Sequence, residues 1–440
     1  MTDQEPIPTA TEGRSWFDSA SFGMFIHFDQ ASRLGLDLSW PIVGLLSDSG
    51  TGPRAVTPPD YYAHVDDFDP QAWDPTALAE RARRAGMRYA VFTTKHHSGW
   101  AAWPSSATDL SIASSPFGRA GRDLVREYVD AFRAAGLRIG LYYSLSDWAD
   151  PDYPAWRPEF APYAFDDYPR PSAESWERYL GGMRRELDEL LTDYGRIDLL
   201  WFDGGWERTA EEWRSVELEQ HIRTLQPEIV INDRLPGVGD YATPEQSAPA
   251  DPMSGPWEAC VTMNTTWGYV PDDLDYKTSA SLIRTLVESV AGGGALLLNV
   301  GPDADGAVVP QEAAILDDIA EWMTAHRESV IGAGPGLSAW QHYGPSTRAG
   351  DAVYLHLFGW PDGELTVRGL PVRAIDEVAL LSTGEPLPWS ATVDPAHARD
   401  EDPRGLLTVQ LGARRPDTAV PVVRVRFRSE DAAAMARTGS

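Results

Sequence analysis

Carboxylate, histidine and arginine side chains recur directly after short apolar segments of this chain. The clearest case is Trp201-Phe202-Asp203-Gly204, in which a carboxylate follows an apolar run and two aromatic residues. Such a carboxylate would face a pocket rather than bulk water, and there it can act as a nucleophile or as a base. The alternative is an Asp-Gly turn that only ends a core strand.

Five further apolar segments end in polar or aromatic residues in the same way. The residues at these ends are His27 and Asp29, Lys95 with His96 and His97, Asn232 with Asp233 and Arg234, Asn264 with Trp267, and Asn299. A turn, or a hydrogen-bonded buried side chain, would explain any one of them. Their repetition at the same end of successive segments indicates one shared site instead.

The adjacent pair His96–His97 suggests a metal site, with His27 and Asp203 as further ligands. Neighbouring residues on a strand point to opposite faces, however, so the pair suits two separate tasks better than one ion. The chain also has no Gly-rich phosphate-binding loop. We therefore expect neither a metal nor an organic cofactor.

Two glutamates have simple structural explanations. In Thr243-Pro244-Glu245-Gln246 the residue types predict the start of a helix, with Thr as its cap and Pro at its first position. Glu245 would then be favoured by the helix dipole. Trp257-Glu258 predicts a carboxylate at the opening of a strand.

Side chains that gather at one edge need parallel strands to position them. The predicted strands are Phe22–Phe28, Tyr89–Thr94, Arg138–Ser144, Asp198–Phe202, Glu228–Ile231, Ala259–Met263 and Ala295–Val300. The predicted helices are Pro75–Ala85, Asp123–Ala135, Trp176–Tyr194, Glu211–Leu225, Ser279–Val290 and Gln311–Ala325. This alternation predicts a mostly parallel sheet covered by helices. Seven or eight such units in about 330 residues favour a (β/α)8-type barrel over a doubly wound sheet.

The character of the chain changes after about residue 335. Five short alternating segments, separated by turn clusters, then predict antiparallel strands. They are Ala352–Phe358, Leu365–Val367, Glu377–Leu381, Leu406–Leu411 and Val422–Phe427. We expect a barrel domain over residues 1–335 and a C-terminal antiparallel β-sandwich over residues 336–440.

Composition narrows the classes of partner. Among 440 residues, 37 Lys and Arg face 66 Asp and Glu, a formal charge of −29, which argues against nucleic acid or an anionic membrane as partner. The single cysteine, Cys260, excludes an intramolecular disulfide framework. No apolar run is long enough to span a bilayer, and residues 1–15 lack the features of a secretory signal, so a cytoplasmic location is expected.

Several of these motifs together resemble the α-L-fucosidases of glycoside hydrolase family 29, in order and rough spacing, from about residue 15 to 330. The matching segments are Phe22–His27, Tyr89–Trp100, Arg122–Val125, Gly140–Ser144, Trp201–Gly204, Asn232–Arg234, Gly239–Gln246, Trp267–Tyr269 and Leu297–Pro302. A trailing β-sandwich is also usual in that family. The resemblance implies a retaining exo-glycosidase that removes a terminal α-L-fucose from a small glycoside or an oligosaccharide, without a cofactor.

The resemblance also implies roles for individual residues. Asp203 matches the family's nucleophile, and Glu245 matches its acid/base, with Glu258 as the rival for that role. Retaining enzymes need two such carboxyl groups about 5–5.5 Å apart. The residues expected to hold the sugar are His27, Trp40, His96, His97, Trp201, Arg234 and Trp267. An apolar wall from Trp267 and Met263 would take the methyl group of fucose, and Trp100, Trp103 and Trp148 are expected near the pocket mouth.

The sequence also departs from the family pattern around the expected sugar site. His27-Phe28-Asp29 stands where the family usually has His-Trp-Gly, and His97-Ser98-Gly99-Trp100 where it usually has His-Asp-Gly-Phe. Two alternatives therefore stay open. One is an enzyme for a related α-L-sugar such as α-L-galactose, and the other is a catalytically weak carbohydrate-binding homologue.

Overall fold

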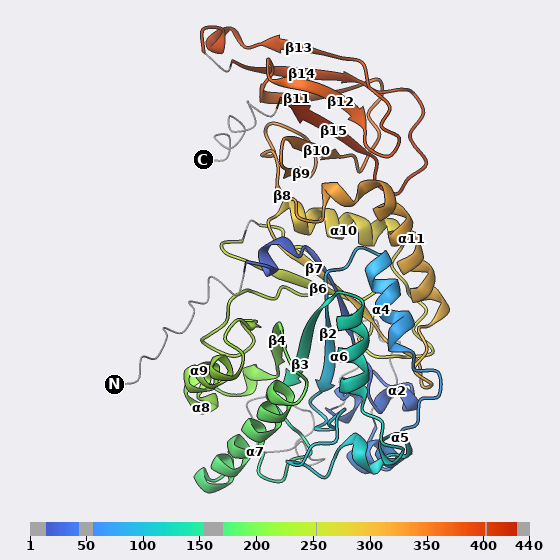
Figure 1. Ribbon diagram of the computed structural model, residues 1–440, viewed down its shortest axis with the longest axis vertical. Coiled ribbons are helices and arrows are strands. Elements are labelled where there is room, and N and C mark those ends of the chain that lie inside the picture. Colours follow the sequence, from blue (N-terminus) through green and yellow to red (C-terminus); the bar gives the residue numbers. More distant parts are fainter. Residues whose placement is uncertain (1–14, 44–55, 154–169, 252, 401–402, 429–440) are drawn as a thin grey trace.

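The computed structural model describes residues 15–43, 56–153, 170–251, 253–400 and 403–428. Its larger part is a curled parallel sheet of seven strands with helices on its outer side (Figure 1). The order across the sheet is β5-β4-β3-β2-β1-β7-β6. The strands are β1 (Phe22–Ile26), β2 (Tyr89–Lys95), β3 (Arg138–Ser144), β4 (Leu199–Asp203), β5 (Val230–Ile231), β6 (Glu258–Val261) and β7 (Ala295–Val300). All seven predicted strands are present, and every neighbouring pair is parallel.

A short extended segment lies between the two outermost strands, β5 and β6. Its backbone bridges Asn232 to Tyr241 on one side and Glu245 to Cys260 on the other. The helix predicted to start at Thr243 is therefore wrong. The Cys260 N–H donates to the Pro244 carbonyl and the Gln246 N–H donates to the Cys260 carbonyl, so this backbone pairs with β6 instead of closing a helical turn.

The covering helices follow the predicted pattern with one exception. They are α4 (Pro75–Arg84), α6 (Leu124–Ala134), α7 (Ala173–Thr192), α8 (Ala210–Trp213), α9 (Ser215–Leu225), α10 (Ser279–Ala291) and α11 (Pro310–His326). Three further short helices are α2 (Ala31–Leu34), α3 (Pro58–Tyr62) and α5 (Pro116–Arg119). The single helix predicted over 211–225 is two helices. Thr209 and Glu212 form a capping box that starts α8, and Arg214 between α8 and α9 is left-handed, with φ of 54°.

The two faces of the curled sheet bury different sets of side chains. Met24 and Ile26 of β1 join the large cluster under the helices, whereas Phe25 between them joins a smaller inner cluster. Leu200 and Phe202 of β4 face outward in the same way. This period of two places every second strand residue inside the curl, where the site lies.

The C-terminal part contains two antiparallel sheets, of five strands in the order β12-β15-β10-β9-β8 and of three in the order β11-β14-β13. Their strands are β8 (Gly334–Pro335), β9 (Ser346–Ala349), β10 (Ala352–His356), β11 (Glu364–Pro371), β12 (Ile375–Leu380), β13 (Trp389–Val393), β14 (Arg404–Gln410) and β15 (Val422–Phe427). Side chains of both sheets share one apolar cluster, which includes Val353, Val367 and Val425. The sequence did not predict β8, β9 or β13. Strand β8 is only a Gly-Pro pair, and most residues of β9 and β13 are not fully buried.

The C-terminal sheets rest on α10 and α11, as Figure 1 shows. The Trp322 indole N–H of α11 donates to the Val420 carbonyl at 3.0 Å, and Ala352 and Val422 belong to the core of the parallel part. In the described part of the chain, no helix combines the length and apolarity needed to cross a bilayer.

Candidate active site

A cavity of about 350 Å³ opens at the carboxyl ends of the parallel strands. Of the residues predicted to be catalytic or to hold the sugar, all line it except His97 and Glu258. The lining residues are Phe25, His27, Trp40, His96, Tyr142, Trp201, Asp203, Trp206, Arg234, Glu245, Cys260 and Trp267. Of the polar and aromatic strand ends, His27, His96, Asp203, Arg234 and Trp267 thus line one cavity. The other strand-end residues, Asp29, Lys95, Asn232, Asp233, Asn264 and Asn299, do not line it.

Asp203 ends β4 and lies deep in this cavity, only 6% exposed. Its Oδ2 accepts a hydrogen bond from the Tyr142 hydroxyl at 2.8 Å, and its Oδ1 accepts one from Arg234 Nη1 at 3.0 Å. His97 Nε2 stands 3.7 Å from Oδ2. Both oxygens are therefore held by donors, which fixes the orientation of the carboxylate.

Arg234 joins the two carboxylates of the pocket. Its Nη2 donates to Glu245 Oε2 at 2.8 Å while Nη1 holds Asp203, and its guanidinium lies over the Trp201 ring, 4.6 Å from the centroid. Burial by itself lowers the pKa of Arg234, but the neighbouring carboxylates outweigh it and hold that pKa above its usual value. A permanently charged group thus spans Asp203 and Glu245.

Three histidines lie at the cavity or, in the case of His97, directly behind its lining, and each has its Nδ1 in a hydrogen bond. His27 Nδ1 donates to Asn299 Oδ1 at 2.6 Å. His96 Nδ1 is 2.5 Å from Ser39 Oγ, and His97 Nδ1 is 2.6 Å from Ser144 Oγ. Burial lowers the pKa of His27 to about 4 and that of His97 to about 3, so both rings are neutral near neutral pH.

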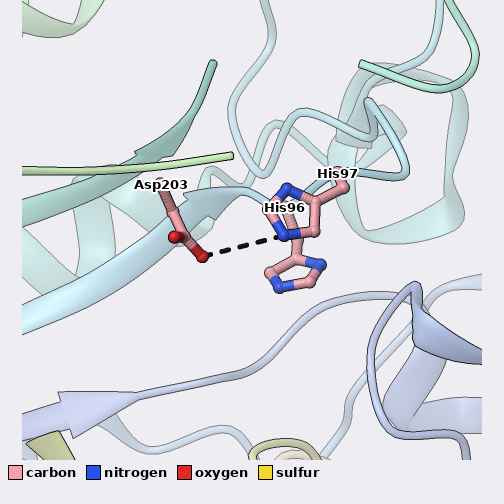
Figure 2. A group of neighbouring side chains, drawn as sticks. All are labelled: His96, His97 and Asp203. Atoms are coloured by element: carbon pink, nitrogen blue, oxygen red, sulfur yellow. Dashed lines mark ion pairs between the residues drawn. The ribbon is translucent and has the colours of Figure 1, made fainter. Parts of the chain in front are cut away.

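Figure 2 shows His96 and His97 turned toward Asp203 together. The prediction that they point to opposite faces is wrong, since the centroids of the two rings are only 4.1 Å apart. The reason is that β2 ends at Lys95, so strand alternation no longer applies to His96 and His97. One ligand atom from each of His96, His97 and Asp203 lies within 4.8 Å of the others. Within the described ranges this is the group of His, Cys, Asp and Glu side chains that could hold a metal ion.

Glu258 occupies a different environment, fully buried next to the indole N–H of Trp201. It accepts hydrogen bonds from the Tyr89 hydroxyl, from the Trp201 indole N–H at 3.0 Å and from the Tyr241 hydroxyl at 3.4 Å. Burial raises its pKa to about 7. This carboxyl group therefore supports the floor of the pocket and does not line it.

Four lining residues were not predicted, namely Phe25, Tyr142, Trp206 and Cys260. Strand alternation could have found Tyr142, because it lies inside the curl one strand from Trp201. No periodicity marks Trp206, which follows the end of β4. Conversely, Met263, Trp100, Trp103 and Trp148 are buried and do not line the cavity; Met263 belongs to the outer core and Trp148 packs behind His97.

Comparison with known protein families identifies the family to which this chain belongs. The family model described as α-L-fucosidase matches residues 5–328. The chain belongs to the α-L-fucosidase family. Members of this family are glycoside hydrolases, and the match covers the whole curled parallel part with its pocket.

Individual relatives extend over the C-terminal sheets as well. The human tissue α-L-fucosidase is 30% identical over 422 residues, covering 89% of this chain and 84% of that protein. The α-L-fucosidase isoenzyme 1 of Paenibacillus thiaminolyticus is 35% identical with a TM-score of 0.81, covering 95% of this chain and 99% of that one. A Bacteroides thetaiotaomicron α-L-fucosidase, solved as a trapped covalent intermediate with 2-fluoro-fucosyl fluoride, is 25% identical with a TM-score of 0.78, covering 97% and 98%.

Proposed function

We propose that this protein is a retaining, exo-acting α-L-fucosidase with Asp203 as nucleophile and Glu245 as acid/base. The observation that carries the proposal is the single Arg234 guanidinium that holds both carboxylates in one pocket, Asp203 in its depth and Glu245 at its edge. Two carboxyl groups that share one guanidinium lie close together, as a retaining mechanism requires.

The reaction would proceed in two displacements. In the first, an Asp203 oxygen attacks the anomeric carbon, the bond from that carbon to the glycosidic oxygen breaks, and Glu245 gives its proton to the departing oxygen. In the second, ionised Glu245 takes a proton from water, whose oxygen attacks the same carbon and releases Asp203. The Arg234 contact suits the ionised form of Glu245, which acts as the base in the second displacement. For the first displacement, Glu245 must carry a proton when substrate binds.

Glu245 suits the acid/base role better than Glu258 for reasons of access. The Glu245 side chain is 41% exposed at the pocket edge, where it can reach both a leaving group and a water molecule. Glu258 is fully buried, and its oxygens accept hydrogen bonds from Tyr89, Trp201 and Tyr241. We therefore assign Glu258 to the support of Trp201.

The remaining pocket residues suit one terminal neutral sugar. Neutral His27, His96 and His97 can each exchange hydrogen bonds with sugar hydroxyls, and His97 Nε2 is buried without a hydrogen-bond partner of its own. Phe25 and Trp267, with ring centroids 5.9 Å apart, offer an apolar surface for the methyl group of fucose. The buried floor of Phe25, Tyr142 and Trp201 supports exo action, since it ends the pocket.

We also propose the finer architecture expected from the sequence. The segment that bridges β5 and β6 would complete a (β/α)8-type barrel, and the shared apolar cluster of the C-terminal sheets supports a β-sandwich. The domain boundary would then lie near residue 335. The cytoplasmic location stays a prediction from composition.

The direct test is hydrolysis of an aryl α-L-fucoside by the wild-type protein and by Asp203→Ala. We expect the substitution to lower kcat by several orders of magnitude, because no covalent intermediate can form without the nucleophile. Retained activity in this variant would remove the assignment. An aryl α-L-galactoside measured in parallel tests the related-sugar alternative, and no turnover of either would favour the binding homologue. EDTA should leave the rate unchanged; a loss would indicate a metal at His96, His97 and Asp203.

A further inference from the structure

A group of buried polar side chains that does not line the cavity lacks hydrogen-bond partners. Its members are Asp29, Gln30, Tyr61 and Ser98, each at most 2% exposed. Within the described part of the chain, their side-chain atoms without a partner are Asp29 Oδ2, both amide atoms of Gln30, the Tyr61 hydroxyl and Ser98 Oγ. A buried polar atom without a partner costs free energy. A bound group that contacts these atoms would remove this cost.

The four side chains meet although they come from three segments of the chain. Asp29 and Gln30 follow β1, Tyr61 belongs to α3, and Ser98 follows β2. The hydroxyl of the next residue of α3, Tyr62, donates to the Ser98 carbonyl at 2.9 Å. Burial raises the pKa of the Tyr61 hydroxyl, and the charge of Asp29 raises it further. Ser98 and Gln30 act on the same pKa in the opposite direction, so all three side chains lie around that hydroxyl.

The Asp29 carboxylate indicates what the bound group is. Its Oδ1 accepts the Ala31 N–H at 2.8 Å, which leaves Oδ2 for another partner. A buried carboxylate of this kind takes up a proton or a cation. A proton would serve one oxygen only, and a water molecule would leave the charge without compensation. One cation would contact the carboxylate and the neighbouring oxygens together.

The donor set also limits the type of cation. Carboxylate, amide and hydroxyl oxygens are ligands of hard cations, and a single carboxylate balances a single positive charge. We propose that one monovalent cation, Na⁺ or K⁺, binds to Asp29 Oδ2, Gln30 Oε1, the Tyr61 hydroxyl and Ser98 Oγ. The cation would tie the segment after β1 to the turn after β2, the two segments that carry the histidines of the pocket. This role goes beyond the proposed function, whose chemistry uses no cation.

The test measures stability, so its outcome is independent of the proposed function. Thermal unfolding of the full chain is followed in NaCl, KCl, CaCl2 and choline chloride at one ionic strength, with choline as a cation too large for a buried site. We expect Tm in NaCl or KCl to exceed Tm in choline chloride by about 2 °C, because an ion that binds only the folded chain stabilises it. Asp29→Asn removes the charge at constant size and should abolish this difference. Tyr61→Phe keeps the ring, loses one ligand and should reduce it.

Asp198→Asn is the matched control. Asp198 is also buried, but Arg138 and the Ile139 N–H donate to its oxygens, so this variant should lose stability and keep the difference between salts. Equal Tm of the wild-type protein in all four salts would overturn the proposal, since protons or water would then suffice. A difference that persists in Asp29→Asn would place the cation elsewhere, and stabilisation by CaCl2 alone would contradict the single charge. If Asp29→Asn does not fold, an unchanged difference in Tyr61→Phe overturns the proposal.

Discussion

At the residue scale, the two carboxylates of the pocket differ in what surrounds them. Asp203 is buried with donors on both oxygens, whereas Glu245 has one charged partner and an exposed side chain. A nucleophile must be held still in one orientation, and an acid/base must exchange a proton with water once in each cycle. The environments therefore suit the two different roles proposed for these residues, even though both contact Arg234.

Chemical rescue distinguishes Glu245 from Glu258. With an activated aryl fucoside, Glu245→Ala should form the covalent intermediate but turn it over slowly, because no base activates water. Azide needs no base, so it should restore turnover and give a fucosyl azide, which is measured by product analysis. In Glu258→Ala we expect lower stability and no azide effect. Rescue confined to Glu258→Ala would reverse the assignment.

At the scale of elements, the end of β2 is fixed by a buried ion cluster. Lys95, the last residue of β2, donates to Asp147 at 2.9 Å and to Glu186 of α7 at 2.7 Å, and all three are nearly inaccessible. His96 and His97 follow at once. The cluster therefore ties the backbone that carries both histidines to a covering helix and to the segment after β3.

Lys95→Met should cost about 3–5 kcal/mol in free energy of unfolding, because it leaves buried carboxylates without their partner. Since burial raises the pKa of Glu186, the folded variant binds a proton more readily than the unfolded chain, and the deficit should shrink as pH falls. Urea titrations at several pH values measure this. Arg83→Met, which breaks the exposed pair with Glu80, is the control and should stay within about 1 kcal/mol of wild type. A loss of the same small size for Lys95→Met would contradict the cluster's importance.

Sequence patterns predict some elements of this fold closely and miss others. Strands such as β3 and β7 were located to the residue, because apolar β-rich runs between turn signals have few other interpretations. The segment at Thr243 was not, because its local signals favour a helix and only its backbone pairing with β6 overrides them. His27, His96, Asp203, Arg234 and Trp267 were predicted because they lie at or just after strand ends, whereas Trp40 and Glu245 were expected only from the family resemblance. Trp206 was missed, because a turn carries no period.

At the scale of the whole molecule, the chain is strongly acidic, whereas the charged side chains that line the pocket nearly balance one another. The chain carries a formal charge of −29, while Arg234 faces Asp203 and Glu245 in the cavity. A neutral sugar needs no electrostatic attraction to enter such a pocket, so the surface charge serves general solvation instead.

It follows that kcat/KM for a neutral fucoside should change by less than about twofold between about 20 mM and about 500 mM salt, because screening acts on charged partners. Initial rates over that range measure it. A substrate that carries an anionic group is the comparison, and its rate should rise with salt as repulsion is screened. A steep salt dependence for the neutral fucoside would show that the acidic surface takes part in binding.

The burial of Cys260 has a practical consequence. It is the single cysteine of the chain, it lies at the floor of the pocket, and burial raises the pKa of its thiol. Since the thiolate is the reactive form, this thiol is a poor target for alkylation. Tyr343→Cys, at a position 99% exposed in the C-terminal part, would then supply one accessible thiol. The protein could be attached to a dye or a solid support through that one atom, with its pocket left open.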